Sequence, residues 1–292
     1  MKTLFKTSVL LIIVSLSLGC GARQSALQGE GGIGERQGDA APLIAEAEAL
    51  WQERGDRAKA QAAIDKWNQA TKVDPTEAKS WLALAYAYYF MANVHIRWDE
   101  EPRDAQMAAF DLGVKAADQA MLIQNPEFAQ AIKGGASWAD AIQHVTKAGV
   151  ASLYWYATNL GKWSMLDGFT TLLANKDRAK LIITKIRDLD ETYFYGAPHR
   201  YFGVYHCKVP MGDKEEGQRS FKAALAVTDG YLDTKVLYAE FYATKTQNEE
   251  LFDKLLNEVI NADPNAIPEM VVENKNAQRA AQDLLDRRDD FF

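Results

Sequence analysis

The feature that most restricts the fold of this chain is a recurring pattern of paired amphipathic segments. The segment VLYAEFYATKTQNEELFDKLLNEVINADP, residues 236–264, places apolar side chains on one helical stripe up to Tyr242 and on a second from Phe252. A short polar turn separates the stripes, and Asp263-Pro264 ends the second. Apolar residues with a period near 3.6 indicate amphipathic helices, and proline does not continue a helix. The segment is therefore predicted to form two helices joined by a turn.

The same arrangement recurs along the chain. Small, aromatic and small residues follow one another at Gly217, Phe221 and Ala224, and at Ala63, Trp67 and Ala70. A further first helix is SWLALAYAYYF, whose partner helix is displaced by an insertion and ends near Asn125-Pro126. Small residues let helices approach while a ring fills the gap, and each hairpin buries its remaining apolar face on the next. The pattern is that of degenerate tetratricopeptide repeats, and it predicts an all-α array of helical hairpins.

Two stretches fit the repeat less closely. Between 127 and 196 we expect helices over 128–149, 150–166 and about 176–190, without the repeat spacing. After Pro268, residues 271–292 read as one amphipathic helix. A terminal helix with a polar outer face is what such an array needs as its cap.

The first twenty residues carry the features of an exported lipoprotein. Lys2 and Lys6 precede an apolar run over 8–18, and Gly19-Cys20 closes it. A basic start, an apolar core and a small-residue exit make up a secretory signal, and the run is too short for a permanent membrane span. A small residue before cysteine resembles a bacterial lipobox, so Cys20 is predicted to carry acyl chains such as palmitate. The alternative is a plain signal peptide with an incidental cysteine.

These assignments divide the chain into three parts. Residues 1–19 form the signal peptide, 20–41 the lipidated Cys20 and a flexible tether, and 42–292 the helical repeat domain. The tether is rich in Gly, Gln and charge, with too few apolar side chains to offset the entropy of ordering. The domain is expected in the periplasm. The residue after Cys20 is Gly21 and not Asp, and by the usual sorting rule of such lipoproteins this favours transfer to the outer membrane.

The mature protein is acidic. Removing 19 of the 292 residues leaves 273 and moves the formal charge from −7 to −9, because Lys2 and Lys6 are lost. An acidic protein gains nothing from a nucleic-acid backbone, so no nucleic-acid partner is expected. Membrane attachment would come from the lipid and not from a basic patch. Cys207 is the only other cysteine, so acylation of Cys20 leaves no internal disulfide.

The motifs of catalysis and metal binding are missing from the sequence. It contains no GxSxG elbow, no Gly-rich phosphate loop and no Cys–His pair with an orienting group. Gly134-Gly135 lies inside a segment predicted to be helical, with no strand before it, so it is not a nucleotide-binding motif. The four histidines lack zinc-ligand spacing. The sequence therefore predicts no enzyme activity, no catalytic residue, no metal and no cofactor.

The aromatic row LYWYATNLGKW is the first candidate ligand site. On a helix, Trp155, Asn159 and Trp163 share one stripe, which places an amide between two indoles. In one interpretation the rings pack between hairpins and each indole N–H finds a partner. In the other, these three residues and Lys162 face the concave side of the array, where aromatic walls with a few polar groups form small-molecule sites. Trp138 would join that wall from the preceding helix.

A second polar and aromatic cluster lies at the corner YFYGAPHRYF. Gly196 and Pro198 are predicted to turn the chain between helices there. The candidate ligand residues are His199, Arg200 and Tyr201, with Arg200 offering a fork for a carboxylate. The alternative is a loop that the tyrosines merely pin in place.

The lipobox, the tether, the degenerate hairpins and the segments SLYWYATNLGKW and YGAPHRYFG together resemble the TatT family. TatT is the lipoprotein T component associated with tripartite ATP-independent periplasmic (TRAP) transporters, and the likeness runs from about residue 40 to the end. It implies a periplasm-facing lipoprotein that forms a homotrimer with a central opening and pairs with the solute-binding P subunit. It also implies delivery of a hydrophobic or organic-acid ligand, without a set of ligand residues to carry over.

Two functions follow from these observations. The first is a lipid-anchored auxiliary component of a TRAP-type uptake system that binds a solute-binding protein and a small ligand in a cavity faced by Trp155 and Trp163. The second is an adaptor in cell-envelope assembly that binds protein segments in an open groove lined by Asn93, Lys162 and Arg200, without a small-molecule ligand.

Overall fold

The computed structural model of the protein describes residues 32–292. All regular structure in this range is helical and no strand occurs in it, so the all-α prediction is confirmed. The signal peptide, Cys20 and the first part of the tether lie outside the described residues. No helix within 32–292 combines the length and the apolar character that crossing a bilayer requires.

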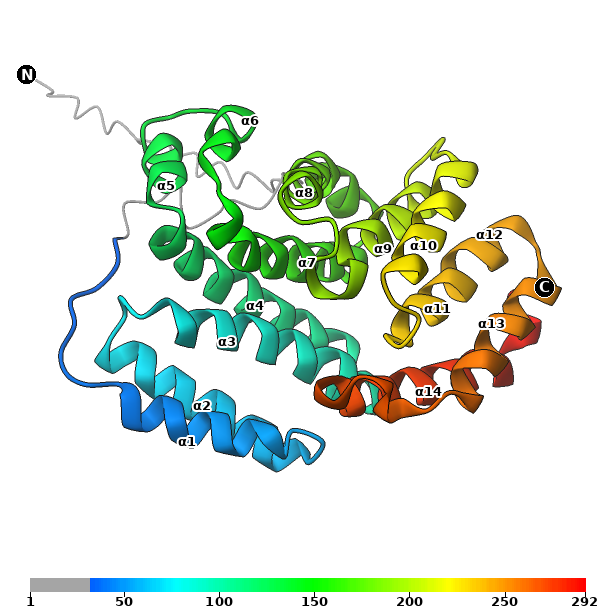
Figure 1. Ribbon diagram of the computed structural model, residues 1–292, viewed down its shortest axis with the longest axis horizontal. Helices are drawn as coiled ribbons and strands as arrows, with labels where there is room; N and C mark the ends of the chain where they lie inside the picture. Colours follow the sequence, from blue (N-terminus) through cyan, green and yellow to red (C-terminus); the bar gives the residue numbers. More distant parts are fainter. Residues whose placement is uncertain (1–31) are drawn as a thin grey trace, which may run out of the picture.

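The N-terminal part consists of two helical hairpins packed in sequence order (Figure 1). Its helices are α1 (Ala41–Gln52), α2 (Arg57–Val73), α3 (Ala78–Phe90) and α4 (Arg103–Gln124). Asp56 caps α2 by accepting hydrogen bonds from two backbone N–H groups, and Glu77 caps α3 in the same way. Such side chains satisfy donors that the first turn of a helix leaves unpaired.

The middle part is formed by α5 (Pro126–Lys133), α6 (Trp138–Ala141), α7 (Val150–Asp167) and α8 (Phe169–Leu189). The helix expected over 128–149 is wrong. Gly134 ends α5, Gly135 takes a φ of 88°, and Ser137 starts the short α6. The helix expected from about 176 begins earlier, because Gly168, with a φ of 136°, marks the break after α7.

The C-terminal part contains α9 (Tyr193–Lys208), α10 (Lys214–Val227), α11 (Asp233–Leu237), α12 (Thr244–Thr246), α13 (Glu249–Asn261) and α14 (Val271–Asp286). Phe221 of α10 is fully buried, and its ring occupies the space that the small residues around it leave. A Cβ on Gly203 of α9 would lie 2.7 Å from the Phe221 ring. The predicted small–aromatic–small packing therefore joins these two helices.

Two helices continue into π-helical turns, Met91–His95 after α3 and Tyr238–Ala243 after α11. A π-helical turn spreads the backbone hydrogen bonds and is often found at functional sites. Both turns lie on the side of the array where α7 and α9 leave an opening, as described below.

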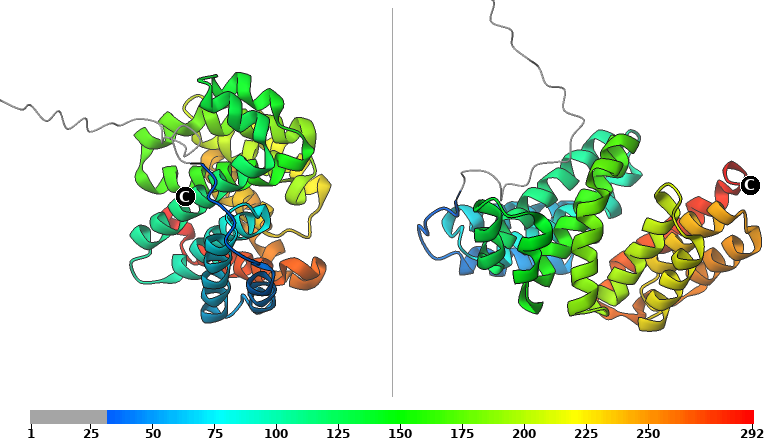
Figure 2. Two further views of the ribbon diagram at one scale, coloured as in Figure 1. Left: turned by 90° about the vertical axis from the view of Figure 1, so that its left-hand side faces the viewer. Right: turned by 90° about the horizontal axis from the view of Figure 1, so that it is seen from above.

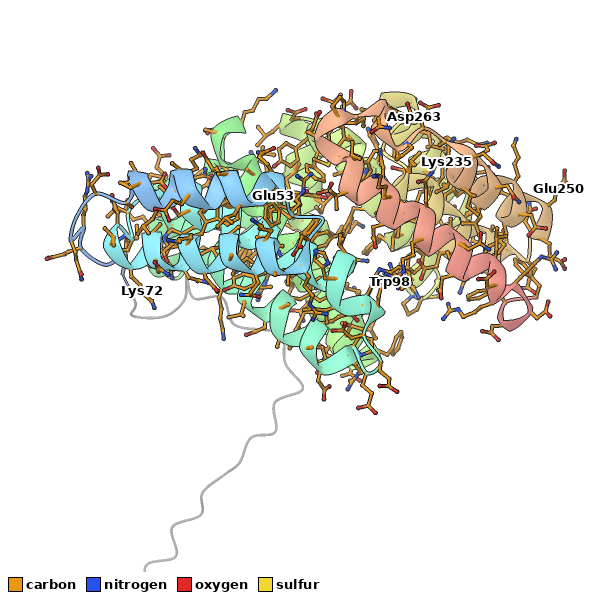
Figure 3. All side chains as sticks on the ribbon, turned by 90° about the horizontal axis from the view of Figure 1, so that it is seen from below. Glu53, Lys72, Trp98, Lys235, Glu250 and Asp263 are labelled. Atoms are coloured by element: carbon orange, nitrogen blue, oxygen red, sulfur yellow. The ribbon has the colours of Figure 1, made fainter. Side chains whose placement is uncertain are left out.

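The array curves so that its last helix returns to its first hairpins (Figures 1 and 2). Arg54, in the α1–α2 turn, pairs with Glu273 of α14 at 3.0 Å, and the Tyr86 hydroxyl of α3 also donates to Glu273. Trp98 donates to Asn276 of α14 at 2.9 Å, and Figure 3 shows Trp98 beside that helix. Helix α14 therefore closes the array as well as capping it.

The end of the proposed tether is part of the domain. Arg36 forms an ion pair with Asp74 at 3.1 Å, and the Gln37 N–H donates to the Val73 carbonyl at 2.8 Å. Ala40 is buried. The hydrophobic clusters found in the described residues all lie between Ala40 and the C-terminus. A chain that starts at Gly21 retains every contact that builds this core.

Candidate functional site

A pocket with a volume of about 110 Å³ lies between α7, α9 and α11. Four tyrosines and two cationic side chains give it its character: Tyr89, Tyr154, Tyr201, Tyr231, Lys162 and Arg200. Most of the residues that line the pocket are aromatic or aliphatic, and a few polar groups lie between them. Pockets of this composition are the usual form of small-molecule sites. We refer to it as the Lys162 cleft.

Lys162 occupies the centre of this region. Besides the cleft it lines two neighbouring hollows, one along the Met91–His95 turn and one that includes Glu240 of the second π-helical turn. The Lys162 side chain is half-buried, and its ammonium group makes no hydrogen bond or ion pair within residues 32–292. Burial lowers its pKa from the ordinary value, while the charges of Asp233 and Glu240 act in the opposite direction. A partly desolvated ammonium without a protein partner is a group that an anion can stabilise.

The charge around the cleft differs from that of the whole protein. Cationic side chains line the cleft and the two hollows in slight excess of carboxylates: Arg97, Lys162, Arg200 and Lys208, against Asp233, Glu240 and Glu273. The chain as a whole carries a formal charge of −7. A local positive excess with apolar walls attracts small anions and raises their local concentration.

Two tyrosines add hydrogen-bonding groups. The hydroxyls of Tyr89 and Tyr231 make no hydrogen bond to other described residues, although only 6% of Tyr231 is exposed. Burial raises the pKa of both phenols well above the ordinary value, so they remain protonated. Each can therefore donate a hydrogen bond to an acceptor in the cleft.

Arg200 holds the backbone that shapes one wall. Phe194, Tyr195 and Gly196 all have positive φ angles of 42°, 59° and 75°, which reverses the chain at the start of α9. The Arg200 guanidinium donates to the Tyr195 carbonyl at 2.9 Å and to the Phe194 carbonyl at 3.2 Å. It also donates to the Thr234 hydroxyl of α11 at 3.3 Å. These bonds stabilise a reversal that is unfavourable for non-glycine residues.

The candidate residues from the sequence separate into two groups. Lys162, Arg200 and Tyr201 line the Lys162 cleft together. The guanidinium of Arg200, expected to bind a carboxylate, donates mainly to the backbone carbonyls of Phe194 and Tyr195. Lys162 is therefore the cation of the cleft that remains for a ligand. The predicted turn at Gly196 is present, and it places Arg200 and Tyr201 on α9, which packs on α10 and lines the cleft together with α7.

The other five candidates do not line the cleft. Trp155 is buried and stacks on Tyr86 with ring centroids 4.5 Å apart, and Asn159 is fully buried beside it. The Asn159 amide donates to the carbonyls of Ala85 and Trp155 at 3.0 and 2.8 Å. Both residues thus join α7 to α3, which is the packing interpretation of the aromatic row.

Trp163, Trp138 and His199 also lie elsewhere. Trp163 is partly buried and packs against the hydrophobic core. Trp138 stacks on Tyr156, with centroids 5.6 Å apart, outside the cleft. His199 faces Glu191, 3.5 Å from its carboxylate, near the start of α9.

Several cleft residues escaped the sequence analysis. Tyr89 comes from α3, Tyr231 precedes α11, and Asp233 begins it. No local motif marks them, because they meet Lys162 only through the curvature of the array. In the part of the chain that the structure describes, no three His, Cys, Asp or Glu side chains gather as a metal site.

The comparisons with known proteins identify the family. The sequence pattern of the family described as TRAP transporter T-component (TAtT) matches residues 59–292, from within α2 to the C-terminus. No curated protein matches the chain. The resemblance noted in the sequence is confirmed, since the match covers most of the chain and contains the Lys162 cleft. The chain therefore belongs to the family of TRAP transporter T-components, auxiliary subunits of a transport system of the cell envelope.

Proposed function

We propose that this protein is a lipid-anchored T-component that holds a small organic anion in the Lys162 cleft and docks the solute-binding P subunit of its transporter. Cys20 would carry the anchor and the domain would face the periplasm. A homotrimer remains part of the proposal, as the family resemblance implies it. The single observation that carries the ligand role is the half-buried ammonium of Lys162, which lines a pocket with aromatic walls and has no partner among the described residues.

Three features support an anion in this cleft over another occupant. The cationic side chains around Lys162 outnumber the carboxylates. The free hydroxyls of Tyr89 and Tyr231 are donors, which complement the acceptor atoms of a carboxylate. The remaining wall is apolar, so the ligand gains free energy from burial of its hydrocarbon part.

The ligand role is tested by recovering what the protein carries. Wild-type protein and the Lys162→Met variant, each starting at Gly21, are expressed for export to the periplasm, purified without detergent, and extracted for mass spectrometry of small molecules. The proposal expects an organic acid at near-stoichiometric amounts in the wild type and its loss from the variant. Equal contents in both proteins, or no organic anion in either, would reject the ligand role.

The anchor is tested separately by growing cells with labelled palmitate. The full chain is expected to take up the label, and Cys20→Ala is expected to lose it and to leave the membrane fraction. Label retained by Cys20→Ala would contradict lipidation at that residue. This experiment also decides between the lipoprotein and a plain signal peptide.

A further inference from the structure

A second, largely apolar pocket adjoins the Lys162 cleft. It has a volume of about 70 Å³ and lies between α7, α8 and α9. Leu160, Leu172, Ala179 and Val209 are among its walls. The cleft and this pocket share four lining residues, Gly161, Met165, Tyr201 and Val204. We call it the α7–α8–α9 pocket, and the shared residues make it the immediate neighbour of the cleft.

Gly161 stands where the two spaces meet. It lies inside α7, where a glycine costs about 0.5–1 kcal/mol relative to alanine. Other helical glycines of the chain are explained by contacts, because a Cβ on Gly113 or Gly203 would lie 2.3 or 2.7 Å from a neighbouring side chain. At Gly161 no atom lies within 4 Å of that position. Packing does not require this glycine, whereas an open passage between the two spaces does.

We propose that the Lys162 cleft and the α7–α8–α9 pocket form one site for an amphipathic monocarboxylate. The carboxylate binds Lys162 with Tyr89 and Tyr231 as further donors, and an unbranched hydrocarbon chain crosses Gly161 into the apolar pocket. This inference rests on the proposed function, from which it takes the existence of a small organic anion.

The geometry favours a single negative charge and a narrow chain. Only one cation of the cleft lacks a partner, and Asp233 and Glu240 lie close enough to Lys162 to affect its pKa. A dianion such as a phosphate monoester would be repelled by these carboxylates and would need more donors than one ammonium supplies. The open space at Gly161, where the two pockets adjoin, comes from the absence of one side chain, and a crossing there suits a chain one methylene wide.

The test is calorimetric titration of the protein starting at Gly21 with hexanoate, octanoate, decanoate and 1-decanol. In the wild type, affinity is expected to rise about fourfold for each added methylene that is buried. Gly161→Leu is expected to weaken decanoate binding at least tenfold and to leave hexanoate binding within about twofold. Lys162→Met is expected to weaken all carboxylates at least tenfold and to leave 1-decanol unchanged.

Three controls keep the result interpretable. Lys222→Met removes an exposed lysine that does not line either space, and it should bind decanoate like the wild type. Gly161→Ala adds one methyl group and should weaken decanoate less than Gly161→Leu does. Thermal melting should show that neither Gly161 variant loses stability, because the position has open space around it.

The outcomes separate this inference from the proposed function. Affinity that stays flat with chain length but depends on Lys162 would overturn the amphipathic ligand and keep a compact organic anion. Equal weakening of hexanoate and decanoate by Gly161→Leu would also overturn it. If no carboxylate binds the wild type, both the inference and the ligand role fail, while docking of the P subunit is judged by its own experiment.

Discussion

A charged side chain held in a cleft without a partner destabilises the protein that carries it. Lys162 is in this position, and burial lowers its pKa. The unfolded chain binds the proton of this lysine more tightly than the folded protein does, so wild-type stability rises as pH increases between the folded pKa and the ordinary value near 10.5. Such a residue persists where a ligand requires it.

Replacing Lys162 by methionine should therefore stabilise the ligand-free protein at pH 7. The variant should also lack the contribution of this lysine to the rise in stability that the wild type shows between pH 7 and pH 10.5, its ordinary pKa. Urea unfolding at both pH values measures this difference. A variant that is less stable than the wild type at pH 7, with an unchanged pH dependence, would show that Lys162 is held by favourable contacts.

Two glycines inside helices lead to opposite predictions. In α4, a Cβ on Gly113 would lie 2.3 Å from Asn159 Oδ1, so Gly113→Ala displaces the buried amide that joins α7 to α3. We expect a loss of roughly 1–3 kcal/mol. In α7, Gly161→Ala meets open space and should gain about 0.5–1 kcal/mol. Chemical denaturation of both variants tests the pair, and an equal effect at the two positions would refute it.

At the residue scale the sequence allowed three of the six tyrosine and cationic side chains of the cleft to be predicted. Lys162, Arg200 and Tyr201 were found because each lies in a segment with an unusual concentration of rings and polar groups. Trp155 and Asn159 lie on one helical stripe, which is also what a ligand-binding wall would require. Periodicity alone does not tell whether that stripe faces a ligand or a neighbouring helix. The neighbours are α3 and α4, which bury the stripe together with Phe194.

At the scale of single elements, the start of α9 is the most constrained. Three consecutive residues with positive φ depend on Arg200, whose guanidinium binds the carbonyls of Phe194 and Tyr195. Arg200→Met should cost roughly 2–4 kcal/mol of unfolding free energy, because buried carbonyls lose a charged donor. Arg200→Lys should recover part of it, since an ammonium cannot match the planar fork.

Equilibrium unfolding in urea measures both Arg200 variants. Lys222→Met, at an exposed site, serves as the control for loss of a positive charge. An Arg200→Met variant as stable as the wild type would show that the reversal is held by its rings and not by the guanidinium.

The helical hairpins could be predicted because their apolar period and their Asx-Pro ends are local signals. The stretch 128–149 could not, since its composition is helical while Gly134 and Gly135 break the backbone. The beginning of α8 was also missed, because Phe169-Thr170-Thr171 has low intrinsic helix propensity, and the exposure of Phe169 and Thr170 leaves little packing to explain the helix there. At both places the helix propensity of the local sequence does not match the backbone conformation that the chain adopts.

At the scale of the whole molecule, one buried network closes the array. Arg54 and Glu273 are 219 residues apart in sequence, yet they are joined by two hydrogen bonds of 3.0 Å, with Tyr86 as a third member. Their side chains are each about 10% exposed. No sequence pattern links these positions, because their meeting depends on the summed curvature of all the hairpins.

Breaking this pair should loosen the C-terminal helix from the first hairpins. Glu273→Ala should cost roughly 3–5 kcal/mol, because it leaves Arg54 buried without its carboxylate. The double variant Arg54→Met, Glu273→Leu should be closer to the wild type, since it removes both charges and keeps apolar volume. Hydrogen exchange of α14 should increase in the single variant only. Equal exchange in all three proteins would contradict a closing role for the network.

The family assignment concerns the whole molecule, and so does its most direct test. The full lipidated protein is purified from gently solubilised native envelopes, and the proteins that accompany it are identified by mass spectrometry. The account predicts a solute-binding P subunit of a TRAP transporter at an amount comparable to the protein itself. Recovery of envelope-assembly factors, with no solute-binding protein above the level found with an unrelated lipoprotein, would contradict the proposed partner and favour an adaptor.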